Sequence, residues 1–277
     1  YEICACLVGS EMCIRDRYLH VRDTLERLLD LEVVPLINEN DTVSVDQLRF
    51  GDNDTLAALV ACLVKAQLCV IFSDIEGLFT ANPFEDATAT LIPEVSSITP
   101  DIMALASGSS STVGSGGMIT KIRAARVLMA AGIDMVICQG HNSDFLIQLA
   151  EGQSLGTRFS PCGTVHDITP KKLWIALGDT AKGSLIVDEG AAEALVSRGS
   201  SLLAVGVCGV EGSFAREDIV DIVNTSGRII ARGKAGASSS EITLACGRSQ
   251  REIKGNELLR DLAQRPVVHR DELVVFE

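Results

Sequence analysis

A glycine-rich turn leads directly into a helical pattern at Ser115-Gly116-Gly117-Met118-Ile119-Thr120-Lys121. The glycines leave backbone N–H groups unhindered, and the positive end of the following helix lies at the same point, so the turn suits a phosphate. Lys121 can project its ammonium over that anion, and Thr120 adds a hydroxyl donor. A flexible turn before a surface lysine would give the same pattern, because the segment is not a GxxxxGK[ST] loop. We interpret it as a candidate phosphate site.

Acidic and amide side chains gather at two neighbouring places, Asn38-Glu39-Asn40-Asp41 and Gly51-Asp52-Asn53-Asp54, at or beyond the end of an apolar run. Ligands of open parallel sheets bind at the carboxyl ends of strands. Amides can contact a zwitterionic amino acid, Asp41 can hold its ammonium, and the carboxylates of Asp52 and Asp54 can orient Mg²⁺ or its waters. Ordinary turn chemistry, with Asp54 as a helix N-cap, explains the same residues and is compatible with substrate contact.

Two further motifs lie elsewhere in the chain, and the first directly follows a predicted strand. Ser73-Asp74 precedes Gly77-Leu78-Phe79, and its carboxylate can meet polar groups of a nucleotide. His269-Arg270-Asp271 has the letters of a protein-kinase catalytic loop, but none of that family's other motifs surrounds it. We interpret it as a turn beside a strand.

The elements that position these residues read as alternating helices and uniformly apolar strands, which predicts an α/β fold with a mainly parallel sheet covered by helices on both faces. The predicted strands are 33–37, 68–72 and 135–138. The predicted helices begin at Tyr18, Asp54, Pro100 and Met118 and at a cap on Asn142 or Ser143.

The sequence pattern changes after Gly156-Thr157, where short predicted strands alternate with turn residues. We predict strands over 171–177, 183–187, 218–223 and 228–232 and a helix over 191–196. This pattern indicates a small α+β, barrel-like second domain. The predicted division is a first domain over 18–160, a linker over 161–170 and a second domain over 171–277.

Composition favours small-molecule chemistry. The chain has 277 residues and a formal charge of −13, which repels nucleic acid and acidic lipids. Its nine cysteines are scattered and lie mostly in apolar runs, so we expect buried thiols rather than disulfides or metal ligands. We find neither an apolar run long enough for a membrane span nor a signal peptide, and we expect a cytoplasmic protein.

The segment Tyr1–Arg17 shows neither a sustained helical period nor strand alternation. It resembles translated sequencing-adapter sequence, and we interpret it as a foreign segment from a misassembled gene. Resequencing the locus tests this hypothesis.

The ordered combination of motifs resembles the glutamate 5-kinases of the amino-acid kinase family. The matching stretches are Ile37–Asp41, Gly51–Asp54, Ser73–Thr80 and Gly116–Lys121. The resemblance covers Tyr18 to the end, because Val187–Ala191 and Val268–Asp271 are similar to the PUA domain that many bacterial members append.

The resemblance implies transfer of the ATP γ-phosphoryl group to the side-chain carboxylate of L-glutamate, the first step of proline biosynthesis, with Mg²⁺ on the nucleotide. It implies that Lys121 and Asp54 are catalytic and that a homo-oligomer forms. The implied substrate residues are Asn38, Asp41, Asp52 and Asn53, and the implied ATP residues are Ser73, Asp74 and Ser115 to Lys121.

The sequence departs from the family at its start. A complete member begins with a lysine-glycine phosphate loop and a later Ser/Gly/Ala-rich turn, and Tyr1–Arg17 stands in their place. We therefore expect little or no kinase activity from the chain as written.

Several alternatives stay open. Within the family, acetylglutamate, aspartate or carbamate are other acceptors. The PUA-like tail leaves open feedback inhibition by proline, oligomer contacts, or an RNA-binding or RNA-modifying role. The basic residues that favour RNA are Lys171, Lys172, Arg228, Arg232, Lys234, Arg248 and Arg251.

Overall fold

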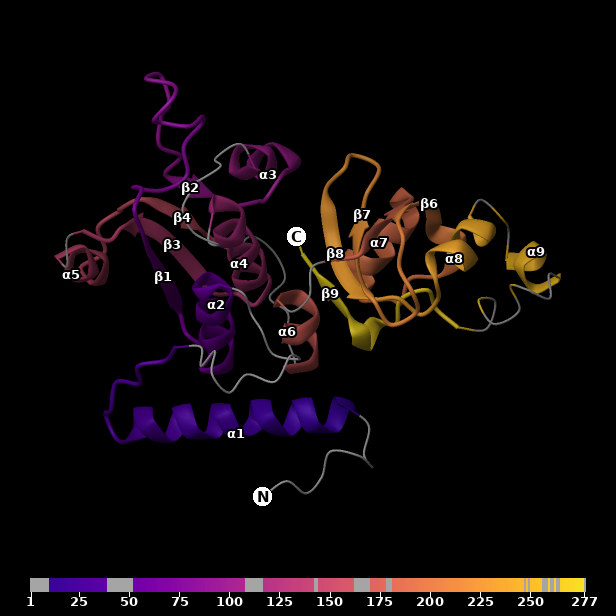
Figure 1. Cartoon of the computed structure of the whole chain (residues 1–277), viewed down its shortest axis with the longest axis horizontal. Helices are drawn as coiled ribbons and strands as arrows, with labels where there is room; N and C mark the ends of the chain where they lie inside the picture. The colour runs from indigo at the N-terminus through magenta and orange to yellow at the C-terminus, as the bar shows by residue number, and fades with distance from the viewer. Residues whose placement is uncertain are drawn as a thin grey trace.

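The computed structural model of the chain contains two sheets, each with its own helices (Figure 1). It describes residues 10–38, 52–107, 117–141, 144–161, 170–177, 181–246, 248, 250–255, 259, 262 and 265–276. Within these residues, no helix is long and apolar enough to cross a membrane.

The first sheet has four strands in the order β1-β3-β4-β2. The strands are β1 (Leu68–Ser73), β2 (Glu94–Val95), β3 (Asp134–Gln139) and β4 (Thr157–Phe159). β1 runs parallel to β3 and β2 runs parallel to β4, whereas β3 and β4 are antiparallel. The sheet is therefore mixed, with two parallel pairs and one antiparallel pair.

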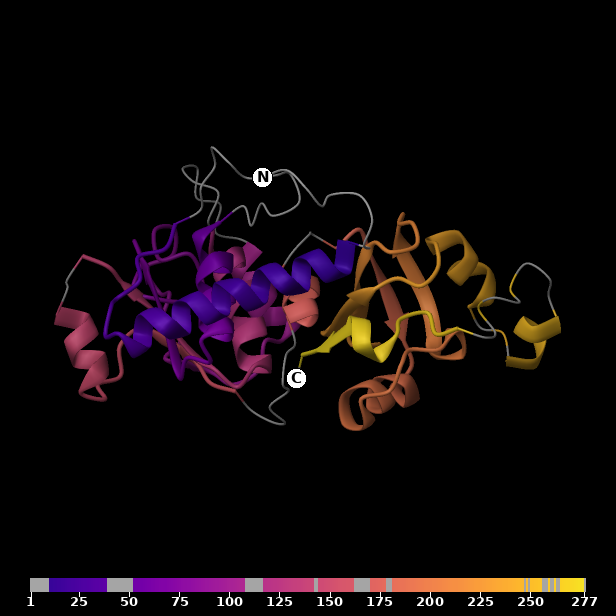
Figure 2. The same cartoon turned by 90° about the horizontal axis from the view of Figure 1, so that it is seen from below.

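Two helices cover one face of this sheet, α2 (Asn53–Leu63) over β1 and α4 (Met118–Ala130) over β3. Both helices are buried nearly all round between the sheet and other helices, and α4 also buries the charged residues Lys121 and Arg126. The remaining helices of this part are α1 (Ser10–Asp30), α3 (Pro100–Ser107) and α5 (Asp144–Ala150). Figures 1 and 2 show α1 lying along one side of the first sheet and its helices.

The second sheet has five strands in the order β6-β5-β7-β8-β9. Its strands are β5 (Gly183–Val187), β6 (Val207–Gly212), β7 (Ile219–Val223), β8 (Ile229–Lys234) and β9 (Leu273–Val275). Its helical elements are α7 (Glu189–Arg198), α8 (Ser239–Ala245), α9 (Gln250–Gly255) and the short 3₁₀ turns Ala204–Gly206 and Arg270–Glu272. The second 3₁₀ turn leads into β9, so the interpretation of His269-Arg270-Asp271 as a turn beside a strand is confirmed.

Helix α6 (Pro170–Leu177) lies between the two sheets (Figure 1). It packs against α1, α2 and α4 on one side and against β8 and β9 on the other. Leu173, Ile175, Ala176 and Leu177 join the same apolar cluster as the first sheet. The predicted boundaries 18–160, 161–170 and 171–277 stay predictions, but by packing α6 belongs to both parts.

Four element predictions are wrong. The run 33–37 is not a strand: it pairs with no strand among the described residues, and Val34 and Leu36 are 81% and 96% exposed. Residues 171–177 form α6 rather than a strand, since a short apolar run fits either element. The first helix begins at Ser10 instead of Tyr18. The cap of α2 is Asp52 rather than Asp54.

The other helices and strands predicted for described residues are confirmed to within a few residues. The proposed caps at Asn142 and Ser143 lie outside the described residues. Cys62, Cys69, Cys138, Cys208 and Cys246 are free thiols; of these, Cys69 and Cys138 are buried as expected, whereas Cys208 is exposed.

Candidate active site

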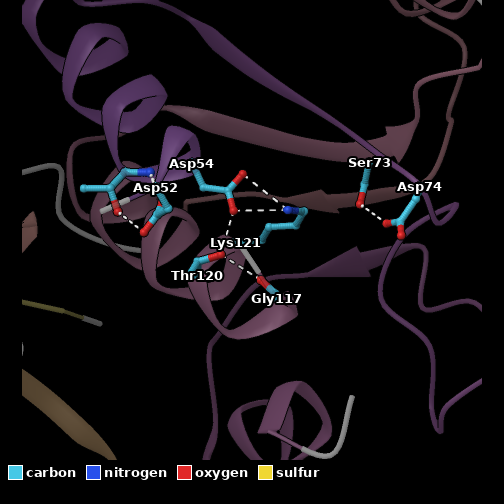
Figure 3. Close-up of polar contacts among 8 residues, drawn as sticks. Asp52, Asp54, Ser73, Asp74, Gly117, Thr120 and Lys121 are labelled. Carbon is cyan, nitrogen blue, oxygen red and sulfur yellow. Dashed lines mark hydrogen bonds and ion pairs between the residues drawn. The ribbon is translucent and has the colours of Figure 1, made fainter. Parts of the chain in front are cut away.

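The N-termini of α2 and α4 meet on one face of the first sheet (Figure 3). Asp52 caps α2, because its Oδ1 accepts from Thr55 N at 2.7 Å and its Oδ2 accepts from the Thr55 hydroxyl at 3.1 Å. Gly117 is the N-cap of α4 and, having no side chain, makes no side-chain cap. Thr120 N donates to the carbonyl oxygen of Gly117 at 3.1 Å, and among the described residues no side chain accepts from the N–H groups of Met118 and Ile119.

Asp54 and Lys121 form a buried ion pair between these two helix ends. Lys121 Nζ lies 3.1 Å from Asp54 Oδ2 and 3.3 Å from Oδ1, and each residue is 8% exposed. Two of the three ammonium protons are directed at Asp54, and no other acceptor contacts this ammonium within the described ranges. The third proton can therefore serve a bound anion.

The hydroxyl of Thr120 is shared between two acceptors. Its Oγ1 lies 2.6 Å from Asp54 Oδ2 and 2.7 Å from the carbonyl oxygen of Gly117 (Figure 3). A hydroxyl has one proton, so it donates to one of these oxygens at a time. Thr120 therefore links Asp54 to the turn that begins α4.

Ser73 and Asp74 lie where β1 ends. The Ser73 hydroxyl donates to Asp74 Oδ1 at 3.0 Å, and the pair is exposed to solvent. Among the described residues, no hydrogen bond joins this pair to Lys121, although Figure 3 draws both groups in one view at the same edge of the sheet. The structure therefore places both predicted nucleotide motifs beyond strand ends, as expected for an open α/β sheet.

A cavity of about 380 Å³ lies beside the start of α4. Its lining is mainly apolar and comes from the loop after β1, from α3 and from Met118. The lining residues are Ile75, Gly77 to Pro83, Glu85, Ala104, Leu105 and Met118. Sequence reasoning missed the contribution of α3, because nothing in an apolar helix of eight residues distinguishes a cavity wall from core.

Thr157 fixes the loop that forms one wall of this cavity. It is fully buried, its hydroxyl accepts from Leu78 N at 2.8 Å, and it donates to the carbonyl oxygen of Ile92 at 2.7 Å. Gly77 packs so closely on it that an added Cβ would lie 2.5 Å from Thr157 Oγ1. In the sequence, Thr157 was noted only at the point where the pattern of predicted elements changes. A glycine in the Ser73–Thr80 motif was the one signal of this close approach.

A buried thiol lies close to the ion pair. Burial and, to a smaller extent, the negative charge of Asp54 raise the pKa of Cys69 to about 11. Cys69 sits on the face of β1 that α2 covers, where burial disfavours the charged thiolate. It therefore stays a protonated thiol at neutral pH.

The remaining predicted site residues fall into two groups. Asn38 and Asn53 are exposed. Asp41, Ser115 and Gly116 lie outside the described residues.

The described residues contain no group of three side chains that could hold a metal. The carboxylates expected to orient Mg²⁺, Asp52 and Asp54, both take part in the protein contacts given above. Carboxylate oxygens are ligands of the kind that Mg²⁺ takes.

The basic residues that favoured an RNA role are partly neutralised. Arg232 makes a two-pronged bond to Asp221, with Nε 2.7 Å from Oδ1, and Lys234 lies 3.5 Å from Glu217. Paired cations attract a phosphate backbone less than free ones do.

Comparison with known proteins agrees with this architecture. A model of the amino acid kinase family matches residues 3–139, and a model of the PUA domain matches residues 183–255. The first match begins inside the segment 1–17, whose foreign origin stays a hypothesis.

Curated relatives align along nearly the whole chain. A glutamate 5-kinase from Myxococcus xanthus is 48% identical over 270 residues, covering 98% of this chain and 71% of that protein. One from Paraburkholderia phymatum is 42% identical, covering 97% and 71%. Among solved structures, a PUA domain from Aeropyrum pernix K1 is 33% identical, covering 36% of this chain and 48% of that one with a TM-score of 0.25. The chain belongs to the glutamate 5-kinase family and carries an amino acid kinase domain followed by a PUA domain.

Proposed function

We propose that the protein transfers the γ-phosphoryl group of ATP to the side-chain carboxylate of L-glutamate, which gives L-glutamyl 5-phosphate and ADP. The observation that carries this proposal is the Lys121 ammonium, held by Asp54 at the uncapped N-terminus of α4. A fixed cation beside the N–H groups of Met118 and Ile119 at a positive helix end is suited to a phosphoryl group. The family relationship supplies the acceptor.

The nucleotide has room beside this cation. The cavity of about 380 Å³ borders Met118, the first residue of α4, and its apolar lining suits a base and sugar. A Cβ built on Gly117 would meet nothing within 4 Å in the described part of the chain, so a phosphate can approach that backbone closely. We propose that Ser73 and Asp74 contact polar groups of the nucleotide and that residues 115–121 hold its phosphates.

The chemistry needs alignment and charge neutralisation more than proton transfer. A glutamate side chain is ionised at neutral pH, so its oxygen can attack the γ-phosphorus while the bond to the β–γ bridging oxygen breaks. Lys121 would neutralise charge on the transferring group, and Asp54 would hold Lys121 in place without contacting the phosphate. Mg²⁺ carried with ATP would neutralise the β- and γ-oxygens.

The acceptor pocket is proposed from the residues before α2. Asn53 is exposed at the start of α2, and Asp41 lies in the segment that precedes this helix in the sequence. We propose that Asn53 and Asp41 contact L-glutamate and that Asn38 and Asp52 shape the pocket. Asp52 would do so through the helix start that it caps.

Trapping of the acyl phosphate with hydroxylamine tests the proposal. The protein is incubated with ATP, Mg²⁺ and one of three acceptors: L-glutamate, N-acetyl-L-glutamate or L-aspartate. Selectivity among the three acceptors is the readout. We expect hydroxamate from L-glutamate in clear excess over the other two acceptors.

A matched pair of lysine variants tests whether Lys121 is the cation needed for phosphoryl transfer. Lys121→Met should abolish hydroxamate formation, whereas Lys182→Met, which removes an exposed lysine of the second domain, should leave it unchanged. Preference for another acceptor, or full activity of Lys121→Met, would contradict the proposal.

A further inference from the structure

Helix α4 carries a second buried cation, Arg126, beyond the ion pair at its start. Arg126 is 7% exposed, and its guanidinium carbon lies 5.6 Å from the centre of the Phe276 ring. Phe276 follows β9 of the second sheet and is 4% exposed. A side chain of the helix that holds Lys121 is thus packed on the PUA domain.

Phe276 is fixed from its own side. Its backbone N–H donates to the carbonyl oxygen of Ile230 in β8 at 2.7 Å. Phe276, Val274 and Ile219 also belong to the apolar cluster that contains the buried face of α4. The ring is therefore part of a continuous core rather than a loose end.

A second arginine, Arg232, joins the second sheet to α6. Arg232 of β8 binds Asp221 through two nitrogens and donates from Nη1 to the carbonyl oxygen of Ala176 in α6 at 3.1 Å. Asp221 and Arg232 are register partners across β7 and β8. The hydrogen bonds of Arg232 thus connect β7 and β8 to α6, which itself packs on α2 and α4.

Burial of a charged arginine at this position has a desolvation cost. Burial lowers the pKa of Arg126 to about 10, and the charge of Asp221 acts in the opposite direction. The positive charges of Arg232, Arg123 and Arg228 lower the pKa of Arg126 further. An apolar side chain would pack on Phe276 without this cost, so packing alone does not account for a guanidinium here.

We propose that Arg126 is a positioning residue, and that its contact with Phe276 sets the placement of α4 and hence of Lys121 against Asp54. Arg126 follows Lys121 by five residues, or about 7.5 Å along the axis of one rigid helix. A shift of α4 at Arg126 is therefore passed to the ammonium. The catalytic consequence rests on the proposed function, whereas the mechanical coupling does not.

A double-mutant cycle tests this coupling in the full chain. The variants are Arg126→Met, which keeps length and loses charge, Phe276→Leu, which keeps apolar bulk and loses the ring, and their combination. Arg126→Lys keeps a cation and serves as the rescue variant. Leu244→Ala, which truncates a half-exposed residue of α8, is the control in the same domain.

The first readout is backbone hydrogen exchange of residues 121–125, followed by mass spectrometry. Each single variant should accelerate exchange there about fivefold, the size expected from loss of one partly desolvated cation–π contact. The combined variant should be no faster than either single one. Arg126→Lys should recover most of the protection, and Leu244→Ala should match the parent chain.

The second readout is kinetic. We expect kcat for hydroxamate formation to fall in Arg126→Met and Phe276→Leu with the KM for L-glutamate unchanged, because only the placement of Lys121 is disturbed. Unchanged exchange at 121–125, or additive effects in the combined variant, would overturn the coupling even if glutamate is phosphorylated normally. Absence of any product from every chain would count against the proposed function, and exchange would still decide the coupling.

A variant that unfolds is recognised by circular dichroism. In that case, Arg126→Lys and Phe276→Tyr, which keep a cation and a ring respectively, replace the first two variants. If these conservative variants, which keep the cation and the ring, exchange at 121–125 about fivefold faster than the parent chain, the charge and the ring are irrelevant and the inference is wrong.

Discussion

Lys121 Nζ lies 3.1 Å from Asp54 Oδ2, and this ion pair joins the first turn of α4 to the first turn of α2. Both side chains are 11% exposed. Neither position is close to the other in sequence, so the pair exists only once the two helices have docked on the sheet.

Removing one partner of this pair should cost both stability and activity. Asp54→Asn and Lys121→Met should each lower the free energy of unfolding by about 3 kcal/mol, because each leaves a buried charge without its counter-ion. Urea unfolding followed by circular dichroism measures the loss. The double replacement Asp54→Leu with Lys121→Met should recover much of the stability while remaining inactive. A double variant as unstable as the sum of the single ones would argue against a buried pair.

The hydroxyl of Thr157 should matter more than its bulk. Thr157→Val keeps the shape but leaves Leu78 N and the carbonyl oxygen of Ile92 without their partner, which should cost about 2 kcal/mol. Thr157→Ser, which keeps the hydroxyl, should cost less, and thermal unfolding compares the two. ATP affinity should fall in Thr157→Val, since the loop it fixes lines the cavity. Equal stability of the two variants would show that the hydrogen bonds are unimportant.

Asp52 should behave as a helix cap. Asp52→Ala should lower the free energy of unfolding by about 1 kcal/mol, while Asp52→Ser should retain most of the cap. The same urea titration measures both. If Asp52 also shapes the acceptor pocket, the KM for L-glutamate should rise in both variants. An unchanged KM in a capped Asp52→Ser chain would confine the residue to a structural role.

Cys69 should make the fold sensitive to alkali. The unfolded thiol has a pKa near 9.0, and burial raises the pKa of Cys69 to about 11 in the folded chain. Below pH 9 the thiol is protonated in both states, so the shift has no effect on stability. Between pH 9 and 11 only the unfolded chain loses the proton, and stability should fall by about 1.4 kcal/mol per pH unit.

The comparison of variants isolates this contribution from other alkaline titrations. Urea unfolding at pH 8, 9 and 10 should show a smaller loss of stability in Cys69→Ala than in the parent chain. Cys208→Ala, which removes an exposed thiol, should keep the parent slope. Identical slopes in all three chains would mean that the thiol of Cys69 is not the cause.

Sequence patterns located most of the first domain because its elements are long or strongly apolar. The helix from Met118 and the strand around Val136 are buried nearly all round, and such segments are distinctive. The error at 33–37 has a physical cause: apolar character alone does not make a strand, which also needs a neighbour for its backbone groups. The error at 171–177 arose because a run of seven residues fits a helix or a strand.

The site was predicted in its residue types but not in its contacts. The phosphate turn and the acidic cluster were both recognised, yet nothing in the spacing of Asp54 and Lys121 shows that they bind each other. Asp54 was interpreted as a cap, because an acidic residue two positions after another suitable cap fits the same pattern. The contact between Arg126 and Phe276 had no local signal at all, since it depends on how two domains pack.

The pairing of the first sheet also governs how the chain reaches its native state. Leu68 pairs with Asp134, and Glu94 pairs with Arg158, so neither parallel pair forms until long intervening segments have been closed into loops. The hairpin of β7 and β8 closes locally. On a ribosome, the cavity beside the start of α4 therefore cannot assemble until β4, which carries Thr157, has emerged, and the apolar strands made before it remain exposed to aggregation or to chaperones until then.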